Sequence, residues 1–312
     1  MLGLLAFGVP GSGAAAAASD GSRSRQSSCP GQTPCPEGSD EPAEGGSCPA
    51  GETWREVGVT TFPLPQGLLR TQGITTDGRG WYFSWQGGLE RTTDNYVETA
   101  AVPLAIPPAL VAQGSDHIGD IDYYKGKLIV PIDDSKSHYT NPYLAIYDAT
   151  TLLPISYHKI NMELPDAASW VAVDPKRGLA MTSRWDKPTQ INLFDINDQM
   201  RHVGGIPLQQ PLSRIQGAKL LDGSLIAAVD DAAKSVYRID LTTGAVTKLF
   251  SLGLAGELEG IAVRPTPDGA LVHVLLIEGG LRDPQNSRIS LHHWARTERA
   301  DCEGARVPEE FR

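Results

Sequence analysis

Polar and aromatic residues that can bind a ligand or move a proton recur at a regular interval along this sequence. Those that stand before or within short apolar stretches are Gln72, His117, Asp120, Trp170, Gln216 and Glu259. Those that follow such stretches are Trp85, Arg184 and Trp185. Carboxylates attract cations, tryptophan rings stack on flat ligands, and a histidine exchanges protons near neutral pH. The recurrence predicts one composite site, provided that the fold brings the repeats together.

Asp120 and Glu259 are candidate ligands of a metal ion. A hard cation such as calcium binds about six to eight oxygen atoms, and the amides of Gln72 and Gln216 would add to the two carboxylates. The alternative is that acidic residues at strand ends cap turns and stay solvated. No contiguous metal-binding loop decides between the two, so calcium is a hypothesis.

His117 is the leading candidate for a catalytic general base. Asp120 and Asp122 follow it closely, and a neighbouring carboxylate can hold a histidine in one tautomer and tune it to accept a proton. The alternative is a structural histidine that forms hydrogen bonds from one repeat to the next.

Six side chains are expected to hold a ligand: Gln72, Trp85, Trp170, Arg184, Trp185 and Gln216. The tryptophans would stack on a sugar or another flat ligand, and the alternative is packing between repeats. The sequence contains no GxSxG or SxxK nucleophile motif and no phosphate-binding GxxxxGK[ST] loop. It therefore leaves open whether the protein is an enzyme.

The elements that position these residues form a repeat. Five similar segments begin at Gln72, Gly119, Ser169, Gln216 and Glu259, and successive starts are 47, 50, 47 and 43 residues apart. Most contain short apolar strands separated by Gly, Asp or Pro turns, and Asp148, Asp195 and Asp240 end the third strand of three units. Four strands per repeat of about 45 residues is the period of a propeller blade.

The last repeat supplies only three strands, and one spare strand, Thr53–Phe62, precedes the first repeat. We therefore predict an all-β propeller of five four-stranded blades, with six as the alternative, in which the N-terminal strand completes the last blade. In such a ring the innermost strands line the axis, so the candidate residues meet at one axial mouth.

The regions outside the repeats differ in composition. Residues 1–18 combine a short apolar run with an alanine-rich end, which is typical of the remnant of a signal peptide and predicts a secreted protein. Residues 19–52 are rich in Ser, Gly and Pro and predict a disordered linker, residues 53–300 the propeller, and residues 301–312 a tail. The N-terminal run is too short to span a membrane, and no other stretch of the sequence could do so.

The charges and cysteines limit the partners further. A net charge of −10 disfavours binding to a nucleic-acid backbone. An even number of cysteines in an exported chain suggests disulfides. Because Cys48 directly precedes the spare strand and Cys302 follows the last one, we predict a Cys48–Cys302 bridge, with Cys29–Cys35 as the local pair.

The segments LEGIAVRPTPDG, YDATT and IDLTTG resemble those of bacterial propellers of the YVTN and gluconolactonase–strictosidine-synthase-like kind. The resemblance covers residues 54–296 and implies a propeller and, for the lactonase-like members, a calcium-dependent hydrolase. The sequence departs from those members because it lacks their Asn-rich PNGL-type metal motif. It also lacks the GH…WD signature of tryptophan–aspartate repeats, and five blades with bridged ends resemble an olfactomedin domain in architecture alone.

Two functions follow from these observations. The first is a secreted propeller that binds a small molecule, a glycan or a protein partner at its axial mouth. The alternative is a calcium-dependent hydrolase of the lactonase or esterase type. The absence of a nucleophile motif and of a complete metal motif favours the first.

Overall fold

The computed structural model describes residues 52–137, 140–160, 168–267, 269–279 and 287–297. The chain divides into two units, residues 1–47 and 48–312, and only the second contains described residues. The cysteines Cys29, Cys35, Cys48 and Cys302 all lie outside the described residues, so the two bridges stay predictions.

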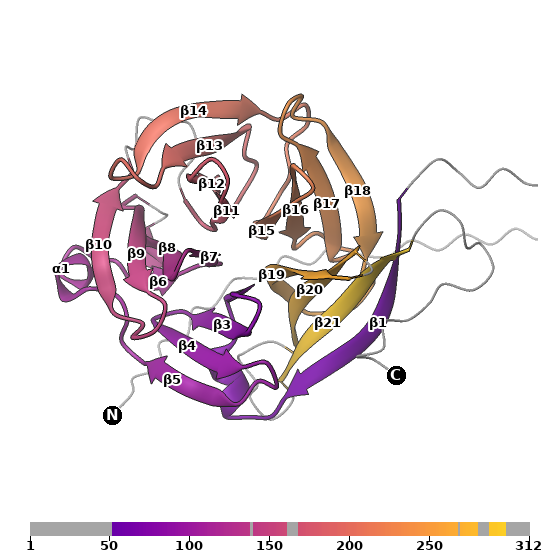
Figure 1. The fold of residues 1–312 in the computed structure, drawn as a ribbon, viewed down its shortest axis with the longest axis horizontal. Coiled ribbons are helices and arrows are strands. Elements are labelled where there is room, and N and C mark those ends of the chain that lie inside the picture. Colours follow the sequence, from indigo (N-terminus) through magenta and orange to yellow (C-terminus); the bar gives the residue numbers. More distant parts are fainter. Residues whose placement is uncertain (1–51, 138–139, 161–167, 268, 280–286, 298–312) are drawn as a thin grey trace, which may run out of the picture. The chain divides into compact units, whose positions relative to one another are not determined.

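The second unit is a propeller of five blades around a central axis (Figure 1), as the repeat predicted. The first blade consists of β2 (Gly73–Thr76), β3 (Gly80–Trp85), β4 (Gly88–Thr93) and β5 (Glu98–Val102). The third consists of β11 (Ala172–Asp174), β12 (Leu179–Thr182), β13 (Gln190–Asp195) and β14 (Arg201–Pro207). The fourth consists of β15 (Ile215–Leu221), β16 (Ser224–Val229), β17 (Ser235–Asp240) and β18 (Val246–Ser251).

The second blade has a divided inner strand, so that its sheet counts five strands. Its strands are β6 (His117–Ile118), β7 (Asp122–Tyr124), β8 (Lys127–Asp133), β9 (Tyr143–Asp148) and β10 (Pro154–Lys159). The break falls at Gly119–Ile121, where Asp120 leaves its own sheet and forms a parallel bridge with Trp170 of the third blade. The break lets the Asp120 side chain project into the axis.

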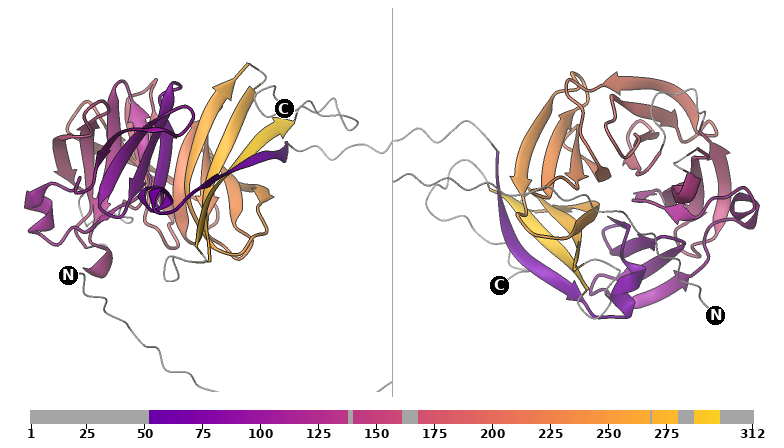
Figure 2. Two further views of the ribbon diagram at one scale, coloured as in Figure 1. Left: turned by 90° about the horizontal axis from the view of Figure 1, so that it is seen from below. Right: turned by 180° about the vertical axis from the view of Figure 1, so that it is seen from behind.

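The last blade is closed by the N-terminal strand. β1 (Thr53–Phe62) pairs antiparallel with β21 (Arg288–Thr297), which continues through β20 (Gly269–Glu278) to β19 (Glu257–Thr266). Figure 2 shows β1 running along the outer side of this blade. The register joins Thr53 to Thr297 and Phe62 to Ile289, so both ends of the chain's propeller segment meet in one sheet. The prediction that Thr53–Phe62 completes the last blade is confirmed.

Local sequence explains the strand ends. Asp148 and Asp240 each end the third strand of a blade. In each case Oδ1 accepts hydrogen bonds from the backbone N–H groups of the residues two and three positions later in the turn. This Asx-type turn replaces the ladder bonds that the strand gives up. The apolar residues of neighbouring blades share one core, as in the cluster that joins Tyr82 and Leu89 of blade one to Leu128 of blade two. The blades therefore stack by burying their faces against one another.

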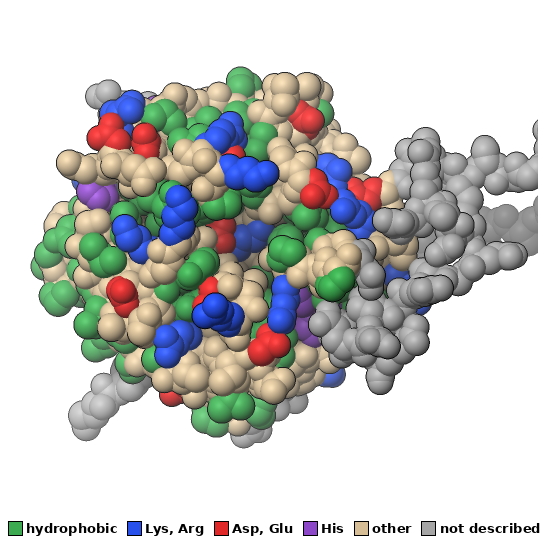
Figure 3. Space-filling model, viewed as in Figure 1, with side chains coloured by type: hydrophobic (Ala, Val, Ile, Leu, Met, Phe, Trp, Pro, Cys, Tyr) green, Lys and Arg blue, Asp and Glu red, His purple; other side chains and the backbone are tan. Residues whose placement is uncertain are grey.

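Helical segments are few and short among the described residues. They are η1 (Gln66–Leu69), α1 (Pro108–Val111) and η2 (Ser135–Ser137). None of them is long and apolar enough to cross a membrane. On the face shown in Figure 3, Lys and Arg side chains are interspersed with Asp and Glu over the ring. A site on this face that selects a charged ligand would therefore need a local cluster of like charges.

Candidate functional site

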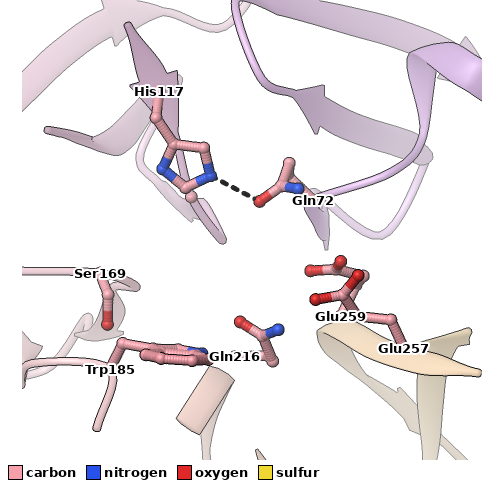
Figure 4. A pocket seen from close by; sticks show the side chains of 8 residues that line it. Gln72, His117, Ser169, Trp185, Gln216, Glu257 and Glu259 are labelled. Carbon is pink, nitrogen blue, oxygen red and sulfur yellow. Dashed lines mark hydrogen bonds between the residues drawn. The ribbon is translucent and has the colours of Figure 1, made fainter. Parts of the chain in front are cut away.

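A small cavity opens where the innermost strands begin (Figure 4). Its volume is about 120 Å³, which is enough for several water molecules or a small polar group. It is lined by Gln72, His117, Gly119, Ser169, Trp185, Gln216, Glu257 and Glu259. All five blades contribute to it, because these residues stand at the starts of five inner strands or at the end of a second strand. The structure thus brings five of the nine predicted site residues, Gln72, His117, Trp185, Gln216 and Glu259, to one place.

The carboxylate of Asp120 is fully buried beside the glycines that follow three of the cavity-lining residues. Its Oδ1 accepts a hydrogen bond from the backbone N–H of Ile74 at 3.0 Å, and its Oδ2 lies 2.5 Å from Nζ of Lys219. Lys219 is also buried, and its Nζ donates to the carbonyl of Ala218. Burial raises the pKa of Asp120 to about 7, while the Lys219 ammonium opposes that rise. The axis is therefore held by an ion pair that joins the second blade to the fourth.

Glycines make room for this carboxylate. Gly73, Gly217 and Gly260 follow Gln72, Gln216 and Glu259 and surround Asp120. A Cβ on Gly217 would lie 2.4 Å from Oδ2 of Asp120, and a Cβ on Gly260 would lie 2.9 Å from its Oδ1. In each Gln-Gly or Glu-Gly pair, the first residue lines the cavity and the glycine leaves space for the Asp120 side chain.

We expect Gly217→Ala to lower the free energy of unfolding by about 1–3 kcal/mol, the usual cost of overpacking a filled core. The new methyl group would displace the Asp120 carboxylate, which is held by its bond to Lys219. Urea unfolding measures the change. Gly87→Ala is the matched control, because a Cβ there meets nothing closer than 4.0 Å. Equal stability of the two variants would contradict the packing described here.

Two carboxylates stand side by side on the wall of the cavity, those of Glu257 and Glu259. Glu259 is only 3% exposed, and its side chain has no hydrogen bond or ion pair within the part of the chain that the structure describes. Burial, and then the charges of Glu257 and Asp230, raise its pKa well above the usual range. A buried carboxylate beside another needs a proton or a cation, since an unpaired buried charge is costly.

Arg214 neutralises this pair only in part, through an ion pair with Glu257. Arg214 forms an ion pair with Asp230, and its guanidinium lies 5.1 Å from the ring centre of Trp185. Its distance to Glu257 is 3.8 Å. Asp230 also accepts hydrogen bonds from Lys234 and from the backbone of Leu258. Arg214 is therefore bound mainly to Asp230, and Glu259 keeps an open carboxylate.

His117 is hydrogen-bonded on both ring nitrogens. Its Nδ1 lies 3.0 Å from Oδ1 of Asp133, and its Nε2 lies 2.7 Å from Oε1 of Gln72. An amide oxygen only accepts, so Nε2 carries a proton and donates it to Gln72. The chain Asp133–His117–Gln72 fixes the Gln72 amide at the cavity wall, with its amino group toward the carboxylates (Figure 4). In this arrangement His117 positions Gln72, and it would have to give up one bond to act as a base.

The other predicted residues lie elsewhere. Trp170 is fully buried among the core residues of blades three and four, and its Nε1 donates to Ser183. Trp85 packs over Gly88, and neither it nor Arg184 is among the residues that line the cavity. Sequence reasoning missed Lys219; the only signal for it was a lysine inside the apolar inner strand QGAKLL.

The residues present do not fit a calcium ion. Asp120 spends one carboxylate oxygen on Lys219 and the other on Ile74, so Glu257 and Glu259 are the acidic groups left to the cavity. Calcium prefers about six to eight oxygen ligands. Within the described ranges, no group of three or more His, Cys, Asp or Glu side chains is placed to hold a metal.

Known proteins resemble this chain in structure. No family model matches the sequence, and no curated protein matches it. A crystal structure of Myxococcus xanthus glutaminyl cyclase superposes with a TM-score of 0.56 at 13% identity, over 79% of this chain and 98% of that one. The WD40 repeats of RRP9 give a TM-score of 0.45 at 9% identity, over 75% and 97% of the two chains. The similarity to the cyclase is one of fold alone.

Proposed function

We propose that the axial cavity binds the ammonium group of a small amine or of a peptide N-terminus. The observation that carries the proposal is the open, nearly buried carboxylate of Glu259 beside that of Glu257. A cation placed between them would relieve their repulsion and the cost of burying Glu259 unpaired. An ammonium suits the limited volume, and its three N–H donors match carboxylate oxygens.

The neighbouring groups support an amine that carries a carbonyl or hydroxyl nearby. The Gln72 amino group is fixed by the hydrogen bond of its oxygen to His117, and it presents donors to the cavity. The Gln216 amide has no hydrogen-bond partner among the described residues, and it offers both a donor and an acceptor. The indole of Trp185 supplies one flat wall. Glycine amide combines an ammonium and a carbonyl at the required size.

The test is a titration of glycine amide into the protein, measured by calorimetry. We expect Glu259→Gln to weaken binding about tenfold or more, because one charge-assisted hydrogen bond contributes about 1.5–3 kcal/mol. Asp198→Asn is the control, since Asp198 lies on an exposed turn beside Arg201. Acetamide, which lacks the ammonium group, should not bind. Equal affinity of Glu259→Gln and the parent protein would refute the proposal.

The pH dependence of the same titration gives a second prediction. Since the pKa of Glu259 is raised in the empty site, the carboxyl is largely protonated below that raised pKa. Binding an ammonium requires the carboxylate, so the proton must leave on binding. Affinity should therefore rise with pH until the amine itself loses its proton. Buffers of different ionisation enthalpy would reveal the released proton, and an affinity independent of pH would contradict this coupling.

Cyclisation at an amine is a second candidate function. Its support is the same carboxyl, whose pKa is raised by burial and which can exchange a proton with a bound amine, together with a fold neighbour named as a glutaminyl cyclase. A peptide with N-terminal glutamine would lose ammonia on incubation, which mass spectrometry detects. Loss of that reaction in Glu259→Gln, with binding of the peptide retained, would favour catalysis over simple binding.

The calcium-dependent hydrolase, for which the described residues form no complete calcium site, can be tested separately. If calcium occupies the mouth, it should raise the melting temperature of metal-stripped protein, and Glu259→Gln should abolish the shift while Asp198→Asn should not. An unchanged melting temperature in millimolar calcium would remove that alternative. We also propose, from the apolar and alanine-rich stretch within residues 1–18, that the protein is exported.

A further inference from the structure

A second and larger pocket lies where the last blade meets the first. It shares no lining residue with the axial cavity. It is bounded by the end of β1, the loop that follows it and the turn between β4 and β5. Its lining residues are Thr60, Thr61, Phe62, Pro63, Gln66, Arg70, Asn95, Tyr96, Val97 and Glu98. We call it the seam pocket. Its volume is about 480 Å³, within the range of about 300–1,000 Å³ that is usual for small-ligand sites.

The inner end of the seam pocket holds Arg70, which is 1% exposed. Its Nε and Nη2 donate to the buried carboxylate of Glu90 at 2.7 and 2.8 Å, and Nη2 also donates to the carbonyl of Tyr96. The guanidinium lies 4.5 and 4.7 Å from the ring centres of Phe62 and Phe83. Nη1 has no hydrogen bond within the described residues. Because Glu90 balances its charge, Arg70 offers a fixed donor that suits a neutral oxygen better than an anion.

The wall formed by the β4–β5 turn is fixed in place. The carbonyl of Asp94 accepts a hydrogen bond from Nε1 of Trp81 at 3.1 Å, and the Asp94 carboxylate pairs with Arg264 at 2.6 Å. The ring of Tyr96 stacks on Trp81 with 5.7 Å between ring centres and meets the edge of Phe62. A ligand would therefore meet a preformed site and would not need to order this turn.

The outer part of the seam pocket carries three polar side chains that have no partner among the described residues, namely Gln66, Asn95 and Glu98. Two amides and a carboxylate are planar groups that present neighbouring donors and acceptors. Sugar hydroxyls are each a donor and an acceptor, so such groups can bond adjacent hydroxyls pairwise. Val97, 61% exposed, and Pro63 offer apolar surface for the C–H face of a sugar ring.

From this arrangement we propose that the seam pocket binds a neutral saccharide of one or two rings. The fixed donor, the three open polar groups and the apolar rim match hydroxyls and C–H groups, and the Arg70–Glu90 pair leaves no net charge at the inner end. A peptide is the other ligand that such a groove could take. Peptides that extend a sheet bind through main-chain groups of an edge strand, whereas the open groups here are side chains.

The test is saturation-transfer NMR with glucose, galactose, mannose, N-acetylglucosamine, maltose and cellobiose. Asn95→Ala and Glu98→Ala are expected to weaken binding about tenfold each, the effect of losing one or two hydrogen bonds. Both side chains are exposed, so these variants should fold like the parent protein. Lys248→Ala, an exposed change on β18, and Glu259→Gln in the axial cavity should leave sugar binding unchanged.

Three outcomes would overturn the proposal. One is that no sugar of the panel binds at millimolar concentration. Another is that a sugar binds but is lost in Glu259→Gln and kept in Asn95→Ala, which would move the site to the axis. The third is that a random peptide mixture binds with sensitivity to Asn95→Ala while the sugars do not. None of these results depends on whether the axial cavity binds an amine.

Discussion

Replacing Lys219 by Met is expected to lower the free energy of unfolding by about 3–5 kcal/mol, the cost of removing one partner of a buried ion pair. Asp120 would then remain at 0% exposure with a single hydrogen bond, to the backbone of Ile74. Its neutralisation by a proton would become easier, since the opposing charge of Lys219 is gone. The loss should therefore be larger at alkaline than at mildly acidic pH.

Urea unfolding of Lys219→Met at several pH values measures both effects. Lys248→Met is the matched control, because Lys248 is exposed on β18 and has no ion pair among the described residues. Adding Asp120→Asn to Lys219→Met should restore part of the loss, since a neutral amide no longer needs a cation. A cost below about 1 kcal/mol for the single change, the size expected of an exposed pair, would show that the axial pair does not support the ring.

Acid is expected to destabilise the blade that closes the ring. His273 and His293 are both 2% exposed and share a hydrogen bond of 2.7 Å between their Nδ1 atoms, and His293 also contacts Thr60 of β1. Burial lowers the pKa of His293 to about 4 and that of His273 well below its usual range. The charge of Arg264 lowers the pKa of His273 further, and that of His292 lowers the pKa of His293. The ring of Trp81 meets the ring of His273 edge to face.

The sign follows from linkage. An unfolded histidine has a pKa of about 6.5, so the unfolded chain takes up protons first and stability falls as the pH drops from there toward 4. For His293 the difference of about 2.5 units corresponds to about 3 kcal/mol once both states are protonated. The raised pKa values of Asp120 and Glu259 act oppositely, because their contribution is present at low pH and is lost as the pH rises.

The measurement is the difference in unfolding free energy between pH 7 and pH 4.5, compared between variants. The double variant His273→Gln with His293→Gln should lose less stability over this interval than the parent protein, whatever its stability at pH 7. His158→Gln on β10 is the control, because the one bond of His158 among the described residues is to Ser156 of its own strand. Parallel pH dependence of all three proteins would rule out the histidine pair as the cause.

Much of the fold could be predicted because its signals are local or repeated. Turn residues, strand length and the spacing of the segments predict the blades, and the missing fourth strand of the last repeat predicts the place of β1. Strand alternation also predicts that His292 and His293 point to opposite faces. They do: His292 bonds to Glu56, whereas His293 bonds to His273.

The candidate site was only partly predictable. Strand starts can be read from the sequence, so the meeting of Gln72, His117, Gln216 and Glu259 follows from ring geometry. The pairing of Asp120 with Lys219 does not, because it joins residues 99 positions apart on blades that are not neighbours. Trp170 illustrates a second limit. Its type fits a ligand platform, but its backbone bridges to Asp120 and its ring is fully buried in the core.

The axial ion pair also bears on how many blades this protein can have. Its two charges come from blades two and four, and they meet because the ring is narrow enough for one carboxylate to reach across the axis, through space left by glycines. A sixth blade would widen the axis and separate the two charges. Each charge would then be buried without its partner or exposed to water. Gain of a repeat by duplication would therefore be harmful unless Asp120 and Lys219 changed together. The pair therefore acts against a change in the number of repeats.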